Sequence, residues 1–417
     1  MLDAGCWVLD AGYWILDTGY WILDNQIPNS KHQASTIKHQ ASSIKNQASS
    51  INYQASSIKY QASNIKHQTS SIKHQTSTIM LTPQEIKSAN ELTSNLLNEL
   101  DRIILGHSRV HRMILVSLLS RGHVLLEGLP GVGKTVLVKT LSKLLGLVYN
   151  RVQFTPDLMP GDILGNHILQ ETGDGTRKMI FQKGPVFTNI LLADEINRAT
   201  PKTQSALLEA MQEQSVTLLG ATRKLPDPFF VLATQNPIEL EGTYPLPEAQ
   251  IDRFLFKLNV NPVAPEILSA IISTRRRGKP PSPDWSMDAE KLNELFAVMD
   301  RMILPEPVAR YISRLVGATH PESAEATEKV RAYVSFGASP RAAIGIAETA
   351  RGHALLEGRP AVGFEDVKAV AAHALNHRLI LNYKARIDRM DSQAVLQELI
   401  SETDETGMNL PNNIEIR

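Results

Sequence analysis

Residues 123–135 read His-Val-Leu-Leu-Glu-Gly-Leu-Pro-Gly-Val-Gly-Lys-Thr, and this segment is the strongest indication of the fold class. The first five residues contain three consecutive apolar side chains, which is typical of a short buried β-strand. The next eight match the pattern Gly-x-x-x-x-Gly-Lys-Ser/Thr in full, and a helix is predicted over residues 133–146. A strand, a glycine-rich loop and a helix in this order indicate a phosphate-binding loop. Glycines allow backbone N–H groups to surround a phosphate, and the helix N-terminus adds partial positive charge.

The side chains of this loop have separate expected roles. Lys134 is expected to reach the β- and γ-phosphates of a nucleoside triphosphate, and Thr135 to ligate Mg²⁺. The predicted nucleotide-binding residues are Gly128, Leu129, Pro130, Gly131, Val132, Gly133, Lys134, Thr135 and Val136.

Two more apolar runs end in polar residues that suit the same chemistry. Residues 187–195 form one run and end in Asp194 and Glu195. We expect Asp194 to hold the Mg²⁺, and Glu195 to accept a proton from the attacking water as general base. Asn236 follows the run 229–234 and would lie between the two motifs, where it could orient the water. Asn-Pro is also an ordinary start of a turn, so spacing alone leaves both interpretations open.

Strands that alternate with helices predict an α/β domain over residues 80–262, in which helices cover both faces of a parallel sheet. Ligands of such sheets bind beyond the carboxyl ends of the strands, where all of these polar motifs lie. The composition changes after residue 262, and residues 263–395 predict a second, all-helical domain without strands. Residues 396–417 are predicted to be a frayed tail, whose end at 412–417 could add an extended piece. The predicted helices are 83–102 and 107–121 before the loop, and 266–278, 288–303, 305–319, 325–335, 339–357 and 364–379 in the second domain.

The first 79 residues consist largely of seven-residue repeats. Three copies resemble Leu-Asp-Thr-Gly-Tyr-Trp-Ile (residues 16–22), and seven resemble Lys-His-Gln-Ala-Ser-Ser-Ile (residues 38–44). A coiled coil needs two apolar positions per heptad, and the second block offers little beyond one isoleucine. The heptanucleotides CTGGATA and AAGCATC, each read three times in triplets, encode these two peptides. We therefore hypothesise that residues 1–79 are translated tandem-repeat DNA, a disordered leader, and that Met80 is the native start. An adhesive or partner-binding tail is the alternative.

The composition excludes several classes of protein. Lys plus Arg and Asp plus Glu both number 43 in 417 residues, so a net charge of zero gives no electrostatic case for binding nucleic acid or anionic membranes. Hydrophobic residues make up 42%, too many for a disordered chain. The single cysteine, Cys6, excludes an intrachain disulfide and is compatible with a reducing, cytoplasmic setting. A helix that spans a membrane needs about 18 consecutive uncharged apolar residues, and the sequence contains no such run.

The set of motifs resembles the AAA+ ATPases, and in detail the MoxR family, across residues 83–395. The matching segments are residues 104–107, 154–165, 194–199, 209–213, 245–254, 337–341 and 377–378. No departure occurs within these motifs, and the repetitive N-terminus is the one feature that the family pattern does not predict.

The resemblance implies roles that the residues alone do not decide. It places Leu105 and Gly106 beside the adenine of ATP. Arg253 is similar to the arginine finger that one subunit presents to its neighbour's nucleotide, and Arg341 to the sensor that touches the γ-phosphate from the lid. Each would place a permanent cation where charge develops. From spacing alone, Arg253 could instead pair with a nearby carboxylate, Arg341 could be a structural residue at a helix start, and Arg198 could face either the neighbour or solvent.

The resemblance also implies a Mg-ATP-dependent hydrolase that forms a homo-oligomeric ring, a hexamer. Such a ring would act as a chaperone-like remodeller in the maturation of client protein complexes, including metal insertion, with partners of the von Willebrand factor A type. A loop over residues 154–169 and a hairpin over 214–228 would face the pore and are candidates for gripping the client, with plain surface loops as the alternative.

Two other functions stay open at this point. A nucleotide-gated scaffold with negligible turnover would show equal, negligible hydrolysis in the wild type and in Glu195→Gln. A DNA-remodelling motor is disfavoured by the neutral charge, and an absence of DNA-stimulated turnover would exclude it.

Overall fold

The computed structural model divides the chain into two units, Met1–Ile79 and Met80–Arg417. In the first unit it describes two short strands, β1 (Val8–Leu9) and β2 (Tyr13–Trp14), which pair antiparallel. In the second unit it describes residues 81–128, 131, 133–171, 177–237, 242–275 and 280–405. The predictions for the other repeat residues, and for residues 412–417, lie outside the described residues.

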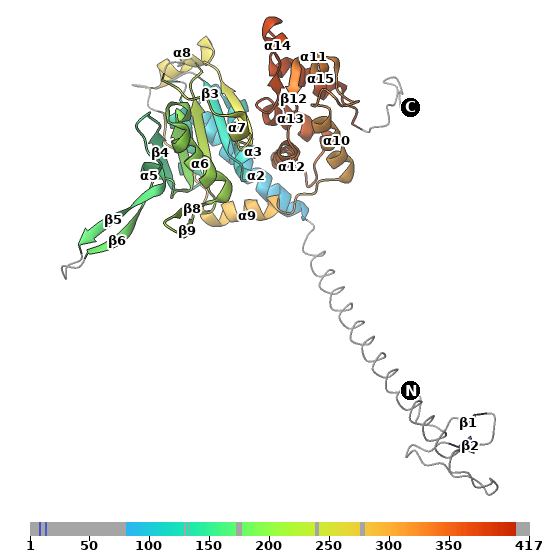
Figure 1. Cartoon of the computed structure of the whole chain (residues 1–417), viewed down its shortest axis with the longest axis horizontal. Coiled ribbons are helices and arrows are strands. Elements are labelled where there is room, and N and C mark those ends of the chain that lie inside the picture. The colour runs from blue at the N-terminus through green and yellow to red at the C-terminus, as the bar shows by residue number, and fades with distance from the viewer. Residues whose placement is uncertain are drawn as a thin grey trace, which may run out of the picture. The chain divides into compact units, whose positions relative to one another are not determined.

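A parallel sheet of five strands forms the centre of the second unit, in the order β11-β3-β10-β7-β4 (Figure 1). Its strands are β3 (Val124–Gly128), β4 (Tyr149–Gln153), β7 (Ile190–Asp194), β10 (Phe230–Gln235) and β11 (Phe256–Val260). The predicted parallel sheet is therefore confirmed. The strand that leads into the glycine-rich loop, β3, lies beside the central strand β10.

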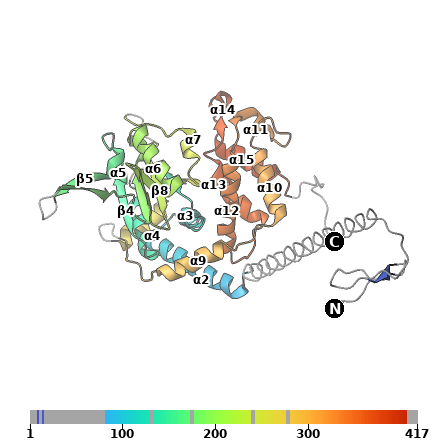
Figure 2. The same ribbon diagram turned by 60° about the horizontal axis from the view of Figure 1, so that its bottom comes forward.

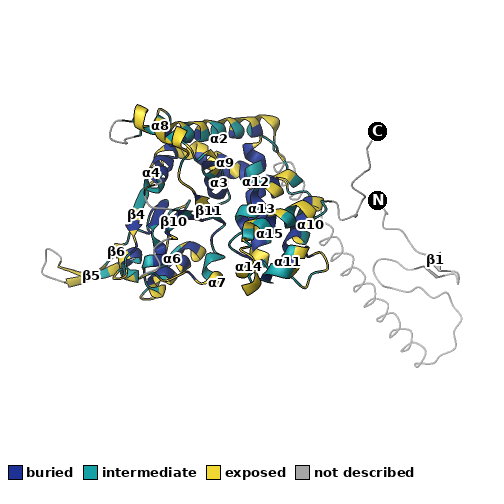
Figure 3. Ribbon diagram, turned by 90° about the horizontal axis from the view of Figure 1, so that it is seen from above, coloured by how far each residue is buried: buried dark blue, intermediate teal, exposed yellow. Residues whose placement is uncertain are grey.

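Helices cover both faces of the sheet because alternate strand residues point to opposite sides. On β10, Phe230 and Leu232 pack into one core cluster, whereas Val231 and Ala233 pack into another. The first cluster includes helices α2 (Pro83–Ile103), α3 (Ser108–Leu119) and α4 (Lys134–Leu144), and the second includes α6 (Pro201–Glu213). Figure 3 shows the central strands as mostly buried between these layers.

The second predicted domain is a helical lid, which packs against α2 and α3 through α12 and α9 (Figure 2). Its helices are α8 (Pro265–Thr274), α9 (Ala289–Met299), α10 (Glu306–Gly317), α11 (Glu328–Tyr333), α12 (Pro340–Leu356), α13 (Phe364–Leu375), α14 (Tyr383–Ile387) and α15 (Ser392–Glu402). One core cluster runs from the sheet into the lid, so the boundary at residue 262 stays a prediction. None of the described helices combines the length and apolar character that crossing a bilayer requires.

Two predictions for the lid were wrong in detail. A short antiparallel ladder joins β12 (Val334–Phe336) to β13 (Ile380–Leu381), and two or three residues are too few to give a strand pattern in the sequence. Residues 396–402, predicted to belong to a frayed tail, continue α15. They are helical because Leu396 and Leu399 are fully buried in the lid core.

Two hairpins extend from the α/β domain. The predicted hairpin over residues 214–228 is confirmed as β8 (Ser215–Leu218) and β9 (Ala221–Lys224). The loop predicted over 154–169 is instead a short helix, α5 (Pro160–Leu164), followed by β5 (Gly165–Glu171), which pairs with β6 (Arg177–Lys183). Most residues on both faces of this second hairpin are exposed, so the sequence lacks the alternation that marks a half-buried strand.

Candidate nucleotide-binding site

The phosphate-binding loop runs from the end of β3 into the first turn of α4. Gly131 and Gly133 have φ values of 85° and 88°, a region that favours glycine, and Gly133 is the N-cap of α4. Lys134 Nζ donates to the carbonyl oxygen of Gly128 at 2.5 Å, so its side chain curls over the loop. Leu129, Pro130 and Val132 lie outside the described residues. Thr135 is half-buried in the first helical turn, and Val136 is exposed.

The first glycine of the motif is required by strand packing. A Cβ atom at Gly128 would lie 2.4 Å from the backbone oxygen of Val260 on β11, which is closer than real contacts allow. Parallel pairing places these two residues opposite each other at the carboxyl end of the sheet. The start of the loop is therefore pressed against the neighbouring strand.

The acidic residues predicted at the end of β7 lie beside this loop. Burial lowers the pKa of Lys134, and the nearby Asp194, Glu195 and Glu127 carboxylates oppose that shift. Thr234, at the end of β10, donates to Asp194 Oδ1 at 2.6 Å and accepts the backbone N–H of Glu195 at 2.8 Å. The lysine and both acids thus form one cluster at the carboxyl edge of the sheet.

Three further polar residues contact the acids. Arg151 on β4 donates to Asp194 Oδ2 at 2.7 Å. Gln153, also on β4, donates to Glu195 Oε2 at 2.8 Å, and Arg198 pairs with the same oxygen at 3.0 Å. Sequence reasoning missed Arg151 and Gln153, because no local motif marks them and only the pairing of β4 with β7 brings them to the site.

Asn236 is buried and follows β10, the strand between β3 and β7. The register sets Gln235 opposite Glu127 on β3, and Ala233 opposite Ala193 on β7. Asn236 therefore lies between the loop and the acids, where the sequence places it, and its task there stays a prediction.

Arg253 and Arg341 lie at the amino-terminal ends of the strands, opposite the carboxyl ends where the loop and the acids lie. Arg253 precedes β11, and its guanidinium donates to the backbone oxygen of Leu208 at 2.7 Å. Arg341, at the start of α12, pairs with Asp252 at 3.3 Å, and half of its side chain is exposed. The five residues of β11 span about 13 Å between this edge and the loop. The structure therefore does not bring either arginine to the phosphate-binding loop of its own chain.

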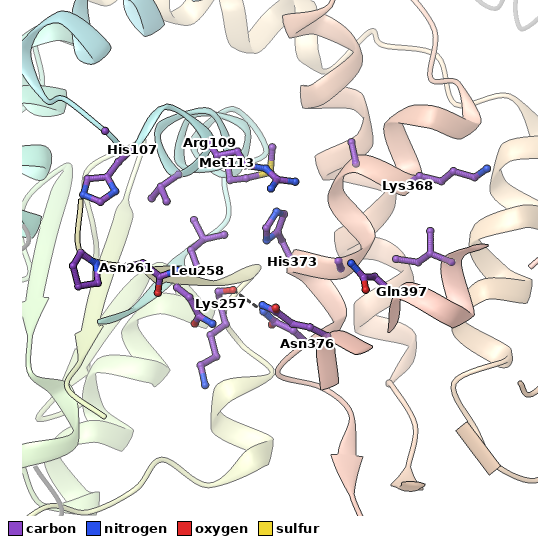
Figure 4. Close-up of a pocket in the computed structure, with 18 of the residues that line it drawn as sticks. His107, Arg109, Met113, Lys257, Leu258, Asn261, Lys368, His373, Asn376 and Gln397 are labelled. Atoms are coloured by element: carbon purple, nitrogen blue, oxygen red, sulfur yellow. Dashed lines mark hydrogen bonds between the residues drawn. The ribbon is translucent and has the colours of Figure 1, made fainter. Parts of the chain in front are cut away.

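A cavity of about 920 Å³ lies between the α/β domain and the lid, and Gly106 is one of the residues that line it. Figure 4 shows His107 and Lys257 on one wall, and Lys368 and His373 on the other. Leu105, the residue before Gly106, is half-buried. Burial lowers the pKa of His107 and of His373, with smaller effects from His111 and Arg109 respectively, which favours neutral imidazoles. The segment predicted to lie by the adenine thus borders a space large enough for a nucleotide base.

Comparison with known proteins agrees with this fold. Residues 123–256 match the model of the ATPase family associated with various cellular activities (AAA), and residues 326–399 match the AAA lid domain. The fold and site thus define a AAA+ ATPase.

Individual relatives narrow the assignment further. The chain is 45% identical over 302 residues to chaperone MoxR1 of Mycobacterium tuberculosis, which covers 72% of this chain and 79% of that protein. It is 35% identical to protein MoxR of Paracoccus denitrificans over 68% of this chain and 87% of that one. A solved structure from Cytophaga hutchinsonii superposes with a TM-score of 0.69 and 36% identity, covering 77% of this chain and 97% of that one. The chain belongs to the MoxR family of AAA+ ATPases.

Proposed function

We propose that this chain binds Mg-ATP at residues 128–136 and hydrolyses it. The observation that carries the proposal is the cluster of Lys134, Asp194 and Glu195 beside a glycine loop at one sheet edge. Both hydrogen bonds that described residues make to the Glu195 carboxylate go to Oε2, so Oε1 is available to accept a proton from water. Asn236 would orient that water, and Leu105 and Gly106 would contact the adenine.

Magnesium suits the donors at this edge. Mg²⁺ prefers oxygen ligands and usually combines one or two protein groups with phosphate oxygens and waters. Asp194 Oδ1 accepts one hydrogen bond from Thr234 and keeps a lone pair, and the hydroxyl of Thr135 lies in the first turn of α4. These two residues would hold the ion, which would offset the charge of the β- and γ-phosphates.

The position of the two arginines supports a site that is completed by a second copy of the chain. Arg253 and Arg341 lie across the sheet from their own loop, where a neighbouring copy in a ring could receive them. We propose a homo-oligomeric ring, a hexamer, in which these cations act on the neighbour's nucleotide. The sensor role of Arg341 is thus proposed between chains, and not within one chain.

We propose that the chain uses the energy of ATP hydrolysis to remodel a client protein complex in the cytoplasm, as a chaperone does. The name of the Mycobacterium tuberculosis relative supports the class, and the two hairpins supply surfaces that could grip a client. Leu219, at the tip of β8–β9, is 82% exposed, and Leu169 and Met179 on β5–β6 are 58% and 60% exposed. Metal insertion and a partner of the von Willebrand factor A type are the specific form that we propose for this activity.

Substitution of Glu195 tests hydrolysis separately from binding. In the full chain, Glu195→Gln should lower kcat by about 10²–10⁴-fold, which is the usual contribution of a general base. The affinity for ATP, measured by titration with and without Mg²⁺, should change little. Glu325→Gln, the same substitution on an exposed lid residue, is the control and should behave as the wild type. Nucleotide binding without magnesium dependence would contradict the proposal, and equal negligible turnover in all three proteins would favour a nucleotide-gated scaffold.

A further inference from the structure

The carboxylate of Asp252, immediately before Arg253, receives three donors from the lid. Arg378 Nε donates to its Oδ1 at 2.6 Å, Arg341 pairs with its Oδ2 at 3.3 Å, and the hydroxyl of Ser339 lies 3.2 Å from Oδ2. The lid residues come from the start of α12 and from the segment after α13. One acidic side chain of the nucleotide-binding domain is therefore the meeting point of two parts of the lid.

Arg378 makes far more contact with this segment than one ion pair requires. Only 3% of its side chain is exposed, and all five N–H groups of its guanidinium find acceptors. Besides Asp252 Oδ1, they donate to the backbone oxygens of Asp252 and Phe254 at 2.9 Å each, of Leu255 at 3.3 Å, and of Ala374 at 2.5 Å. Its acceptors thus lie on both sides of Arg253 in the chain, and on α13 of the lid.

The two residues before Arg378 bind the same stretch of backbone. Asn376 Nδ2 donates to the backbone oxygen of Lys257 at 3.0 Å, and His377 Nε2 lies 3.0 Å from that of Phe254. Burial lowers the pKa of His377 and favours its neutral imidazole, whose other ring nitrogen, Nδ1, lies 3.0 Å from Oδ1 of Asn376. Three consecutive lid residues therefore fix the backbone that carries Arg253.

We propose that Arg378 is a positioning residue for ATP hydrolysis: from the lid, it sets where Arg253 is presented to the neighbouring chain. The inference rests on the proposed action of Arg253 between chains. The guanidinium of Arg253 donates to the backbone oxygen of Leu208 on α6, so among the described residues the lid holds the segment of Arg253 through its backbone. A lid that shifts in one chain would move the cation that serves the next chain's nucleotide. A purely structural ion pair would stabilise the fold and have no such effect between chains.

Mixed complexes distinguish these roles. Arg378→Lys keeps the charge beside Asp252 but cannot supply five donors in a fork. Alone, it should lose about 10²-fold in kcat, the cost of misplacing a reacting group by about 1 Å, with little change in ATP affinity. Lys134→Ala chains lack a working loop but keep an intact Arg253. When the two variants are co-expressed with different tags and purified through both, the intact loop of Arg378→Lys receives an intact Arg253, so activity should exceed the sum of the separate activities.

Two controls make the result decisive. Arg253→Ala mixed with Lys134→Ala should show the same recovery, and Arg310→Lys, on an exposed lid residue, should be as active as the wild type. Recovery with Arg253→Ala but not with Arg378→Lys would overturn the positioning role alone. Absence of recovery in both mixtures would overturn the action of Arg253 between chains and, with it, this inference, while Mg-ATP binding is tested separately by titration. If Arg378→Lys does not fold, as judged by thermal unfolding, Asp252→Asn replaces it with the same expected and contrary results.

Discussion

The hydroxyl group of Thr234 joins the two acidic residues of the candidate site. It donates to Asp194 and accepts the backbone N–H of Glu195. The second bond also holds Glu195 at φ 57°, a left-handed conformation that costs a non-glycine residue about 1–2 kcal/mol. One side chain from β10 therefore fixes both the direction of the Asp194 carboxylate, the proposed magnesium ligand, and the position of the proposed general base.

Replacement of this hydroxyl should impair hydrolysis more than binding. Thr234→Val keeps the shape of the side chain but leaves a carboxylate oxygen and a backbone N–H without their partner, at a cost of about 1–3 kcal/mol. If that cost falls on the transition state, kcat drops by about ten- to a hundredfold. Thr234→Ser retains the hydroxyl and should stay close to the wild type. Steady-state hydrolysis beside ATP titration measures the split, and a fully active Thr234→Val would show that the hydroxyl does not organise the acids.

At this scale, local motifs predict some residues and miss others for a clear reason. Lys134, Asp194 and Glu195 are predictable because each sits at a fixed place in a strand-and-loop pattern. Arg151 and Gln153 carry no such pattern. They reach the site because the register of β4 sets Gln153 opposite Asp194, and register between strands distant in the chain is not written in either strand alone.

Among the elements, the buried start of β3 is joined to two others by His123. Its Nδ1 accepts the backbone N–H of Val231 on β10 at 3.1 Å, and its Nε2 donates to the backbone oxygen of Met211 on α6 at 3.2 Å. Burial lowers the pKa of His123 from 6.5 to about 4. A proton on Nδ1 would also remove its acceptor. The folded chain therefore keeps this imidazole neutral, while the unfolded chain protonates it as the pH falls below 6.5.

The sign of the pH effect follows from that difference. Because the unfolded state binds the extra proton, the free energy of unfolding should fall as the pH drops from 6.5 towards 4. At about pH 5, protonation of His123 in the unfolded chain should lower the free energy of unfolding by about 2 kcal/mol. The Gln side chain in His123→Gln can make both hydrogen bonds and does not titrate. Between about pH 7.5 and pH 5, the free energy of unfolding of this variant should therefore fall by about 2 kcal/mol less than that of the wild type. Urea unfolding at both pH values measures this, and the other buried histidines cancel in the comparison. Equal losses would contradict the prediction.

The elements that the sequence predicts well are those with a simple environment. Strands β7 and β10 are buried on both faces and read as continuous apolar runs, as parallel strands do. The hairpin β5–β6 packs little on either face, so only its pairing defines it. The strand β4 lies at the sheet edge and mixes exposed and buried residues over five positions, too few to establish a period.

In the whole molecule, the sheet separates the loop and the acids from the two arginines. The loop and the acids lie at the carboxyl edge, and Arg253 and Arg341 lie at the other. No local motif could predict this separation, because it depends on where the segment before β11 and the lid come to rest. In a single chain the candidate site therefore holds Lys134, Arg151 and Arg198 but neither Arg253 nor Arg341.

We therefore expect the proposed hydrolysis to depend on assembly of the chains. An arginine supplied by a neighbour is worth about 10³–10⁵ in rate in related nucleotide hydrolases. The kcat per chain should therefore fall steeply on dilution below the concentration at which the chains dissociate, whereas ATP affinity per chain should change little. Sedimentation velocity and hydrolysis, measured across the same concentration series with saturating Mg-ATP, compare the two directly. The Arg253→Ala chain should show low activity at every concentration, because assembly no longer supplies the cation. A wild-type chain that stays fully active while it sediments as a monomer would mean that the site is complete within one chain, and that the two arginines act elsewhere.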